Sequence, residues 1–150
     1  MKKWITYSVV VLLIISVIIN ISFYRDKVKK EKEYFEAFAS VINTTDSTLE
    51  NLQTTENKQK YLYLLLGNLE RMDSLFMLTP SDTYYKYFFN YKLTVYEVLT
   101  NPDIEYTFEY FSPLHHDINL LNNMLFENYM LKVDSVKEFE EILLSVILGN

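Results

Sequence analysis

The stretch WITYSVVVLLIISVIINISFY, residues 4–24, contains no charged side chain and is apolar at most positions. As an α-helix it would extend about 31 Å, which matches the roughly 30 Å hydrocarbon core of a bilayer. Aromatic side chains, which are typical of the membrane–water interfaces, lie near both of its ends. They are Trp4, Tyr7, Phe23 and Tyr24. The stretch therefore predicts a transmembrane helix, with residues 1–24 as an N-terminal anchor that contacts the lipid bilayer through residues 4–24.

A cleaved signal peptide is the alternative to a retained anchor, because Lys2 and Lys3 precede the apolar stretch. The stretch is long for the apolar region of a signal peptide, and no pair of small residues at cleavage-site spacing follows it. Residues 19–23 around its end have the sequence INISF. These features favour a retained anchor and a cell-membrane location.

Two features give opposite predictions for the side of the membrane on which the remaining residues lie. A short tail with two lysines usually stays in the cytoplasm, which places the domain outside the cell. Residues 25–32 carry five basic side chains against two acidic ones, and the positive-inside rule places such a flank in the cytoplasm. We expect an extracytoplasmic domain, because the short N-terminal tail need not cross the membrane. The basic juxtamembrane segment suits contact with phospholipid head groups.

Residues 33–150 have the composition of an acidic helical domain. They carry seven basic and 18 acidic side chains, so this region should repel nucleic acid. The chain contains two Gly and three Pro, fewer than turn-rich β folds use. It contains no Cys, which excludes disulfides, thiolate metal sites and thiol nucleophiles.

Apolar residues in this region recur at alternating steps of three and four, as is typical of amphipathic helices. The short polar connections between the periodic segments favour antiparallel neighbours. The predicted fold class is therefore all-α, with an N-terminal transmembrane helix followed by an antiparallel bundle of about four to five helices. The positions expected to face the core are Phe35, Phe38, Ile42, Thr45, Leu49 and Leu52; Leu62, Leu65, Leu69, Met72 and Phe76; Tyr84, Phe88, Tyr91, Val95 and Val98; Leu114, Ile118, Leu121 and Leu125; and Val136, Phe139, Leu143 and Val146.

Local signals predict where some helices begin and end. Thr79 before Pro80, and Ser112 before Pro113, combine a capping residue with a proline that suits the first turn. Residues 103–111 fit both a strand and a helix. We predict a short helix there, because a lone strand has no partner.

Three further features mark positions within the predicted helices. Ser135 and Glu138 form a capping-box pair at the start of the last helix, and Gly149 suits its C-terminal end. Gly67 lies inside the second helix of the domain, where it is unfavourable by about 1 kcal/mol relative to Ala. We expect it to allow the close approach of another helix.

No residue pattern predicts an enzyme. A chain with two Gly in total has neither a nucleophile elbow of the G-x-S-x-G type nor a glycine-rich phosphate loop. His115 and His116 are adjacent, so on a helix they point about 100° apart and do not share a metal. A zinc site would require one of them with carboxylates such as Glu105 or Glu109. We predict a solvent-exposed polar turn here, and neither a metal nor a cofactor.

The run YYKYFFNY, residues 84–91, surrounds one helix with aromatic side chains. One face of that helix is expected in the core, which leaves a second aromatic stripe. The stripe either packs inside the fold or lies exposed, where it would bind a protein partner or the membrane surface. The residues of this candidate partner surface are Tyr85, Phe89 and Tyr96.

Two polar residues interrupt the predicted anchor. Ser16 and Asn20 would hydrogen-bond either another transmembrane helix or their own backbone.

Together these features predict a membrane-anchored helical protein that acts by protein–protein contact, as a regulatory, immunity-type or assembly partner at the membrane. The alternative is a ligand-sensing extracytoplasmic bundle with an aromatic-lined cavity, for which Gly67, Tyr63 and His115 are candidate lining residues. An enzyme would require a buried, paired carboxylate beside a cleft. A further alternative is a structural tether, which would require neither a partner surface, nor a ligand cavity, nor a paired carboxylate.

Overall fold

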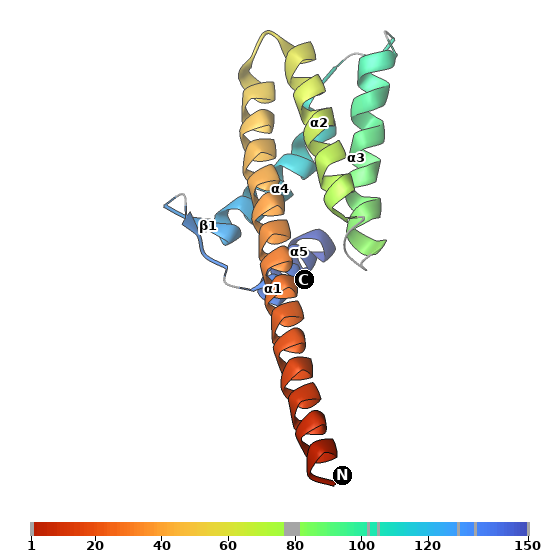
Figure 1. The fold of residues 1–150 in the computed structure, drawn as a ribbon. Coiled ribbons are helices and arrows are strands. Elements are labelled where there is room, and N and C mark those ends of the chain that lie inside the picture. The colour runs from red at the N-terminus through yellow and green to blue at the C-terminus, as the bar shows by residue number, and fades with distance from the viewer. Residues whose placement is uncertain are drawn as a thin grey trace. The chain divides into compact units, whose positions relative to one another are not determined.

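The computed structural model describes residues 2–76, 82–101, 103–104, 106–128, 130–133 and 135–149. These residues are mostly helical, which confirms the all-α class (Figure 1). The chain divides into two compact units, Met1–Tyr34 and Phe35–Asn150. The elements are α1 (Lys2–Thr54), α2 (Lys58–Phe76), α3 (Asp82–Thr100), the 3₁₀ helix η1 (Phe108–Phe111), α4 (Ser112–Leu125), β1 (Phe126–Glu127), β2 (Met130–Leu131) and α5 (Val136–Leu148).

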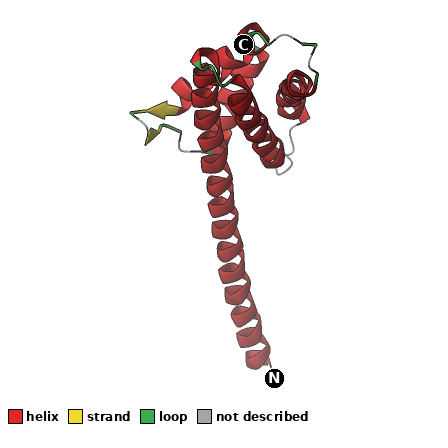
Figure 2. Ribbon diagram, turned by 90° about the horizontal axis from the view of Figure 1, so that it is seen from above, coloured by secondary structure: helices red, strands yellow, loops and turns green. Residues whose placement is uncertain are grey.

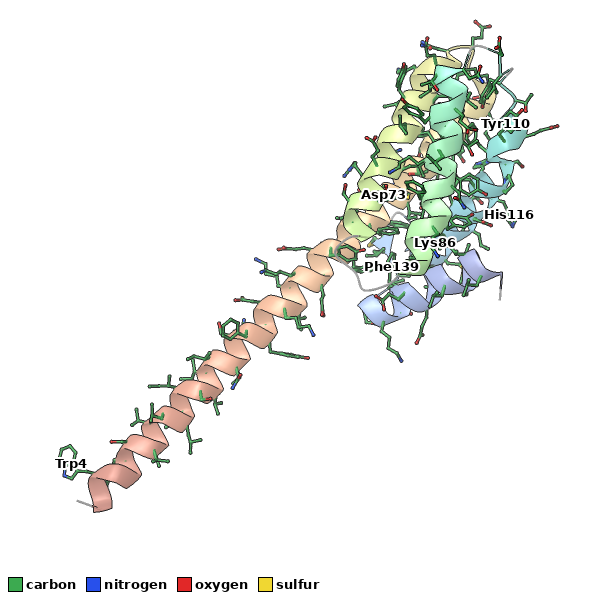
Figure 3. The ribbon with its side chains drawn as sticks, turned by 90° about the vertical axis from the view of Figure 1, so that its right-hand side faces the viewer. Trp4, Asp73, Lys86, Tyr110, His116 and Phe139 are labelled. Atoms are coloured by element: carbon green, nitrogen blue, oxygen red, sulfur yellow. The ribbon has the colours of Figure 1, made fainter. Side chains whose placement is uncertain are left out.

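The first unit is the N-terminal part of α1. This helix is long and apolar enough to cross a membrane, with a mean hydropathy of 2.3 in an 18-residue window of which nothing is buried. Trp4 projects from its first turns and is 80% exposed (Figure 3). Beyond the apolar stretch, Lys27 pairs with Glu31 at 3.5 Å, and Lys29 pairs with Glu33 at 3.6 Å. The two residues of each pair lie four positions apart, so they are neighbours on the surface of the helix and stabilise it.

The C-terminal part of α1 contributes a complete apolar face to the second unit. All six positions predicted for this face are buried, including Thr45, whose hydroxyl donates to the Val41 carbonyl at 2.7 Å. The phenyl ring of Phe139 from α5 packs edge-on against Phe35 and Phe38, with both centroid distances 5.2 Å. Residues that are about 100 positions apart in the sequence therefore share one aromatic cluster.

Helices α2 and α3 lie side by side and run in opposite directions (Figures 1 and 3). Of the predicted core positions, the first four on α2 are buried, as are Phe88 and Val95 on α3. Tyr91 and Val98 are partly buried and pack against the same core. The side chains of Phe76 and Tyr84, and the predicted start signal at residues 79–80, lie outside the described residues.

Residues 108–111 form the short helix η1, as predicted for part of the ambiguous segment. Helix α4 follows directly, and all four of its predicted core positions are buried. Pro113 lies in its first turn, as predicted. The predicted role of Ser112 is wrong: Phe111 occupies the cap position, no side chain caps this helix, and Ser112 is already helical.

A small hairpin between α4 and α5 is absent from the sequence-based prediction. Figure 2 shows its two strands, β1 and β2, in yellow. Phe126 pairs with Leu131 and Glu127 with Met130 in antiparallel register, and Asn128 in the turn has φ 49°. The backbone N–H of Lys132 also donates to the Leu125 carbonyl at 2.8 Å. The hairpin reverses the chain between the two helices.

Helix α5 begins and ends as predicted. The Ser135 hydroxyl accepts a hydrogen bond from the Glu138 backbone N–H at 3.3 Å, which satisfies one donor at the helix start. Gly149 closes the helix in the left-handed region, with φ 67°. Phe139 and Leu143 of this helix are buried in the core.

Candidate functional site

The outer face of α3 carries an exposed apolar stripe, which we define as Phe89, Leu93 and Tyr96. Spacings of four and three place these residues on one side of the helix. Leu93 is 47% exposed and Tyr96 is 58% exposed, whereas Phe89 is partly buried. Leu93 was not predicted, because it is aliphatic and the pattern that predicted this surface is a run of aromatic residues. The side chain of Tyr85, the remaining predicted member, lies outside the described residues.

Two polar pairs hold α3 against its neighbours, one through Tyr87 on the side opposite the stripe and one through Lys92 beside it. The Lys92 ammonium forms an ion pair with Asp73 of α2, a residue that is 6% exposed (Figure 3). The Tyr87 hydroxyl donates to the Asp117 carboxylate of α4. Charge-assisted bonds of this kind are directional, so they fix the rotation of α3 about its axis. The exposure of Leu93 and Tyr96 follows from that fixed rotation.

Burial alters the acidity of the phenols along this helix. Burial first, and then the hydrogen bond to Asp117, raise the pKa of Tyr87 well above its usual range. Burial also raises the pKa of Tyr91, whose ring packs edge-on against Tyr87 at 5.3 Å. Both phenols therefore remain neutral hydrogen-bonding groups at physiological pH.

Asp46 of α1 is the centre of a second buried polar cluster. Its carboxylate accepts hydrogen bonds from the side-chain amide groups of Asn122 at 2.8 Å and Asn119 at 3.5 Å. The Nε2 atom of His115 lies 3.9 Å from the same carboxylate. Asp46 is 5% exposed, so these groups of α4 replace the water that the carboxylate loses on folding.

The expectation of a solvent-exposed turn at residues 115–117 is therefore wrong for His115. Its side chain is 22% exposed and packs edge-on against Phe108, with the ring centres 5.6 Å apart. His116 is exposed, as expected (Figure 3). The sequence signal for this difference is the step of three from His115 to the buried Ile118, which places both residues toward the core. Within the described residues, no three His, Cys, Asp or Glu side chains gather to hold a metal.

Two surface hollows within the second unit bear on ligand binding. One, of about 400 Å³, is lined by Ala37, Gly67, Glu70, Arg71, Ser74 and Leu75. The other, of about 360 Å³, is lined by Asn43, Asn122, Asn123, Phe126 and Asn128. Neither contains Tyr63 or His115, so the structure does not bring the three predicted lining residues together in either hollow. Tyr63 is instead 56% exposed.

The space beside Gly67 is open rather than filled by a helix. A Cβ atom added at this position would meet no described atom within 4 Å. The expectation that Gly67 permits the close approach of another helix is therefore not met by any described part of this chain.

The buried carboxylates have the contacts of structural groups. Asp73 faces a cation, and Asp46 accepts from two amides, so each carboxylate has polar partners where it lies. Asn122 separates Asp46 from the asparagine-lined hollow, because Asn122 lines that hollow and Asp46 does not. Exposed apolar side chains are therefore the features of the second unit that suit recognition, and the stripe on α3 is one group of them. Comparisons with models of known protein families, with curated proteins and with solved structures find no match for this chain.

Proposed function

We propose that this chain is a membrane-tethered helical protein that acts by binding another protein through the outer face of α3. In this proposal residues 4–24 cross the bilayer, and residues 33–150 form an antiparallel helical bundle on the extracytoplasmic side. The exposure of Leu93 and Tyr96 on a helix that two polar pairs hold against its neighbours carries the proposal.

The physical argument for a protein partner rests on rigid presentation. A tyrosine offers a large amphipathic surface with few rotatable bonds, so little conformational entropy is lost when a partner covers it. Leu93 adds an adjacent aliphatic contact that would gain free energy on leaving water. The Lys92 ammonium lies 5.0 Å from the Phe89 ring centre, but its charge is balanced by Asp73. A partner with a complementary apolar surface would fit.

The test is photo-crosslinking in intact cells with a benzophenone amino acid in place of Tyr96. Tyr63 on α2 provides the matched control, since its exposure of 56% is nearly the same as the 58% of Tyr96. We expect a discrete adduct from position 96, and none of that mass from position 63. Tyr96→Ser together with Leu93→Ser should abolish co-purification of the crosslinked partner. An adduct from position 63 alone would contradict the choice of surface.

Sidedness requires its own measurement, for which the absence of native Cys is an advantage. Glu56 lies exposed in the connection between α1 and α2, whereas Asn57 accepts a bond from the Lys60 N–H and is better left intact. Glu56→Cys should react with a membrane-impermeant maleimide on intact cells. Labelling only after lysis would place the domain in the cytoplasm, and would direct the search for a partner there.

Two hollows bear on the ligand-sensing alternative, and neither is the aromatic cavity that it requires. The hollow beside Gly67 has no aromatic ring in its lining, and the asparagine-lined hollow has one, Phe126. The stripe on α3 is therefore the better-supported site.

A further inference from the structure

We infer that two copies of this chain pair within the bilayer through the face of the anchor helix that carries Asn20. The inference rests on the proposed insertion of residues 4–24 into the membrane. It concerns a surface distinct from the stripe on α3.

Asn20 is the most polar residue of the apolar stretch. It lies four residues, or about 6 Å, inside the end marked by Tyr24, so an inserted helix holds its amide within the hydrocarbon. Among the described residues, neither Asn20 nor Ser16 has a side-chain hydrogen bond. Ser8, by contrast, donates to the Trp4 carbonyl at 3.0 Å. An amide without a partner is costly in hydrocarbon, so Asn20 favours a second helix that supplies one.

The residues that share a face with Asn20 form a continuous seam. Successive members are separated by alternating steps of four and three, an average of 3.5 residues. This is the spacing of a left-handed helix pair, in which such a seam stays on the contact line. Ser16, one turn before Asn20, is small and permits close approach of the two backbones. The seam comprises Val9, Leu13, Ser16, Asn20, Phe23 and Lys27.

A second copy is the occupant that the chemistry of Asn20 favours. A side-chain amide carries both donors and an acceptor, so two asparagines that face each other can each donate to the other. Parallel insertion places Asn20 of both copies at the same depth, whereas an unrelated helix would need its own polar residue at that depth. The pairs Lys27–Glu31 and Lys29–Glu33 lie within one helix, and they reduce the repulsion between the two basic segments.

The test is disulfide crosslinking of the full chain in native membranes. The natural chain has no Cys, so each variant carries a single thiol. Ser16→Cys lies on the seam, and Ile18→Cys lies about 200° away around the helix and serves as the control. Mild oxidation should convert Ser16→Cys to a covalent dimer, while Ile18→Cys should remain mostly monomeric.

The role of the amide is tested in the Ser16→Cys background. Asn20→Leu should lower the dimerisation constant about fivefold, as expected for the loss of about 1 kcal/mol of interhelical hydrogen bonding, and Asn20→Gln should largely restore it. Equal crosslinking at positions 16 and 18, or no effect of Asn20→Leu, would overturn the pairing.

Extraction with alkaline carbonate separates this result from the proposed function. Variants that stay in the membrane but do not crosslink at position 16 overturn the pairing alone. A chain that carbonate releases from the membrane overturns the proposed anchor, and the pairing with it.

Discussion

The Lys92 ammonium of α3 donates to the Asp73 carboxylate of α2 and also lies 5.0 Å from the centre of the Phe89 ring. One side chain thus connects a carboxylate that is buried between two helices to the stripe proposed as a binding surface. The pairing of Lys92 with Asp73 positions the helix, and its contact with Phe89 orders one member of the stripe.

Replacement of Lys92 by Met should destabilise the protein, because it leaves the Asp73 carboxylate buried without its cation. The loss of one partner from a buried pair costs about 3–5 kcal/mol, and the 23% exposure of the Lys92 side chain reduces this to about 2 kcal/mol. Urea unfolding of the full chain in detergent micelles, followed by far-ultraviolet circular dichroism, measures the change.

The control for this experiment is Lys86→Met on the same helix, since Lys86 is exposed (Figure 3). It should shift the free energy of unfolding by less than about 0.5 kcal/mol. The double variant Lys92→Met with Asp73→Leu should recover most of the loss, because no buried charge then lacks a partner. Equal effects of Lys86→Met and Lys92→Met would show that the pair is unimportant.

Tyr106→Phe should stabilise the protein at neutral pH. The Tyr106 hydroxyl is buried and has no hydrogen-bond partner among the described residues, while its ring stacks on Phe111 at a centroid distance of 6.2 Å. Phe keeps the stacked ring and removes the unsatisfied hydroxyl, which should raise the free energy of unfolding by about 1 kcal/mol. Tyr110→Phe, at a position that is 48% exposed, is the matched control and should have little effect. A loss of stability in Tyr106→Phe would show that the hydroxyl has a partner, such as a bound water.

The same hydroxyl predicts how stability depends on alkaline pH. Burial raises the pKa of Tyr106 from 10.0 to about 12, so the folded protein holds this proton more tightly than the unfolded chain does. The corresponding stability is fully present below pH 10, and is lost as the pH rises from about 10 to about 12. Tyr106→Phe should therefore lose less stability than the natural chain over this range. Parallel unfolding curves at pH 8 and pH 11 provide the comparison, and identical losses in the two proteins would contradict it.

Periodicity predicted the helices well, because each helix of the second unit buries one continuous apolar face. Every predicted core position of α1, α2 and α4 whose side chain is described is buried, although α1 and α2 bury further residues such as Val41 and Asn68. The hairpin at residues 126–131 was missed because strands of two residues are too short to show an alternating pattern. Asn128, which tolerates a positive φ, was the available signal for its turn.

The buried polar contacts could not be predicted, because they join residues that are distant in the sequence. Asp46 meets Asn122 across 76 positions, and Thr48 accepts from the Asn68 amide across 20 positions. Helical periodicity shows that such residues lie near a core-facing side, but it does not show which helices become neighbours. For the same reason the sequence identified aromatic members of the α3 stripe without showing that Leu93 lies exposed between Phe89 and Tyr96.

The two serines at helix starts provide a last, internally controlled prediction. Ser135 and Ser112 have the same side chain, and both lie where a helix starts, yet only Ser135 occupies a cap position and accepts from a backbone N–H. Ser135→Ala should therefore lower the free energy of unfolding by about 1 kcal/mol, whereas Ser112→Ala should change it by less than about 0.5 kcal/mol. Urea unfolding of both variants under identical conditions measures the difference. An equal or larger loss for Ser112→Ala would mean that Ser112 caps α4. The first turn of this helix, which carries His115 toward Asp46, would then start after Ser112.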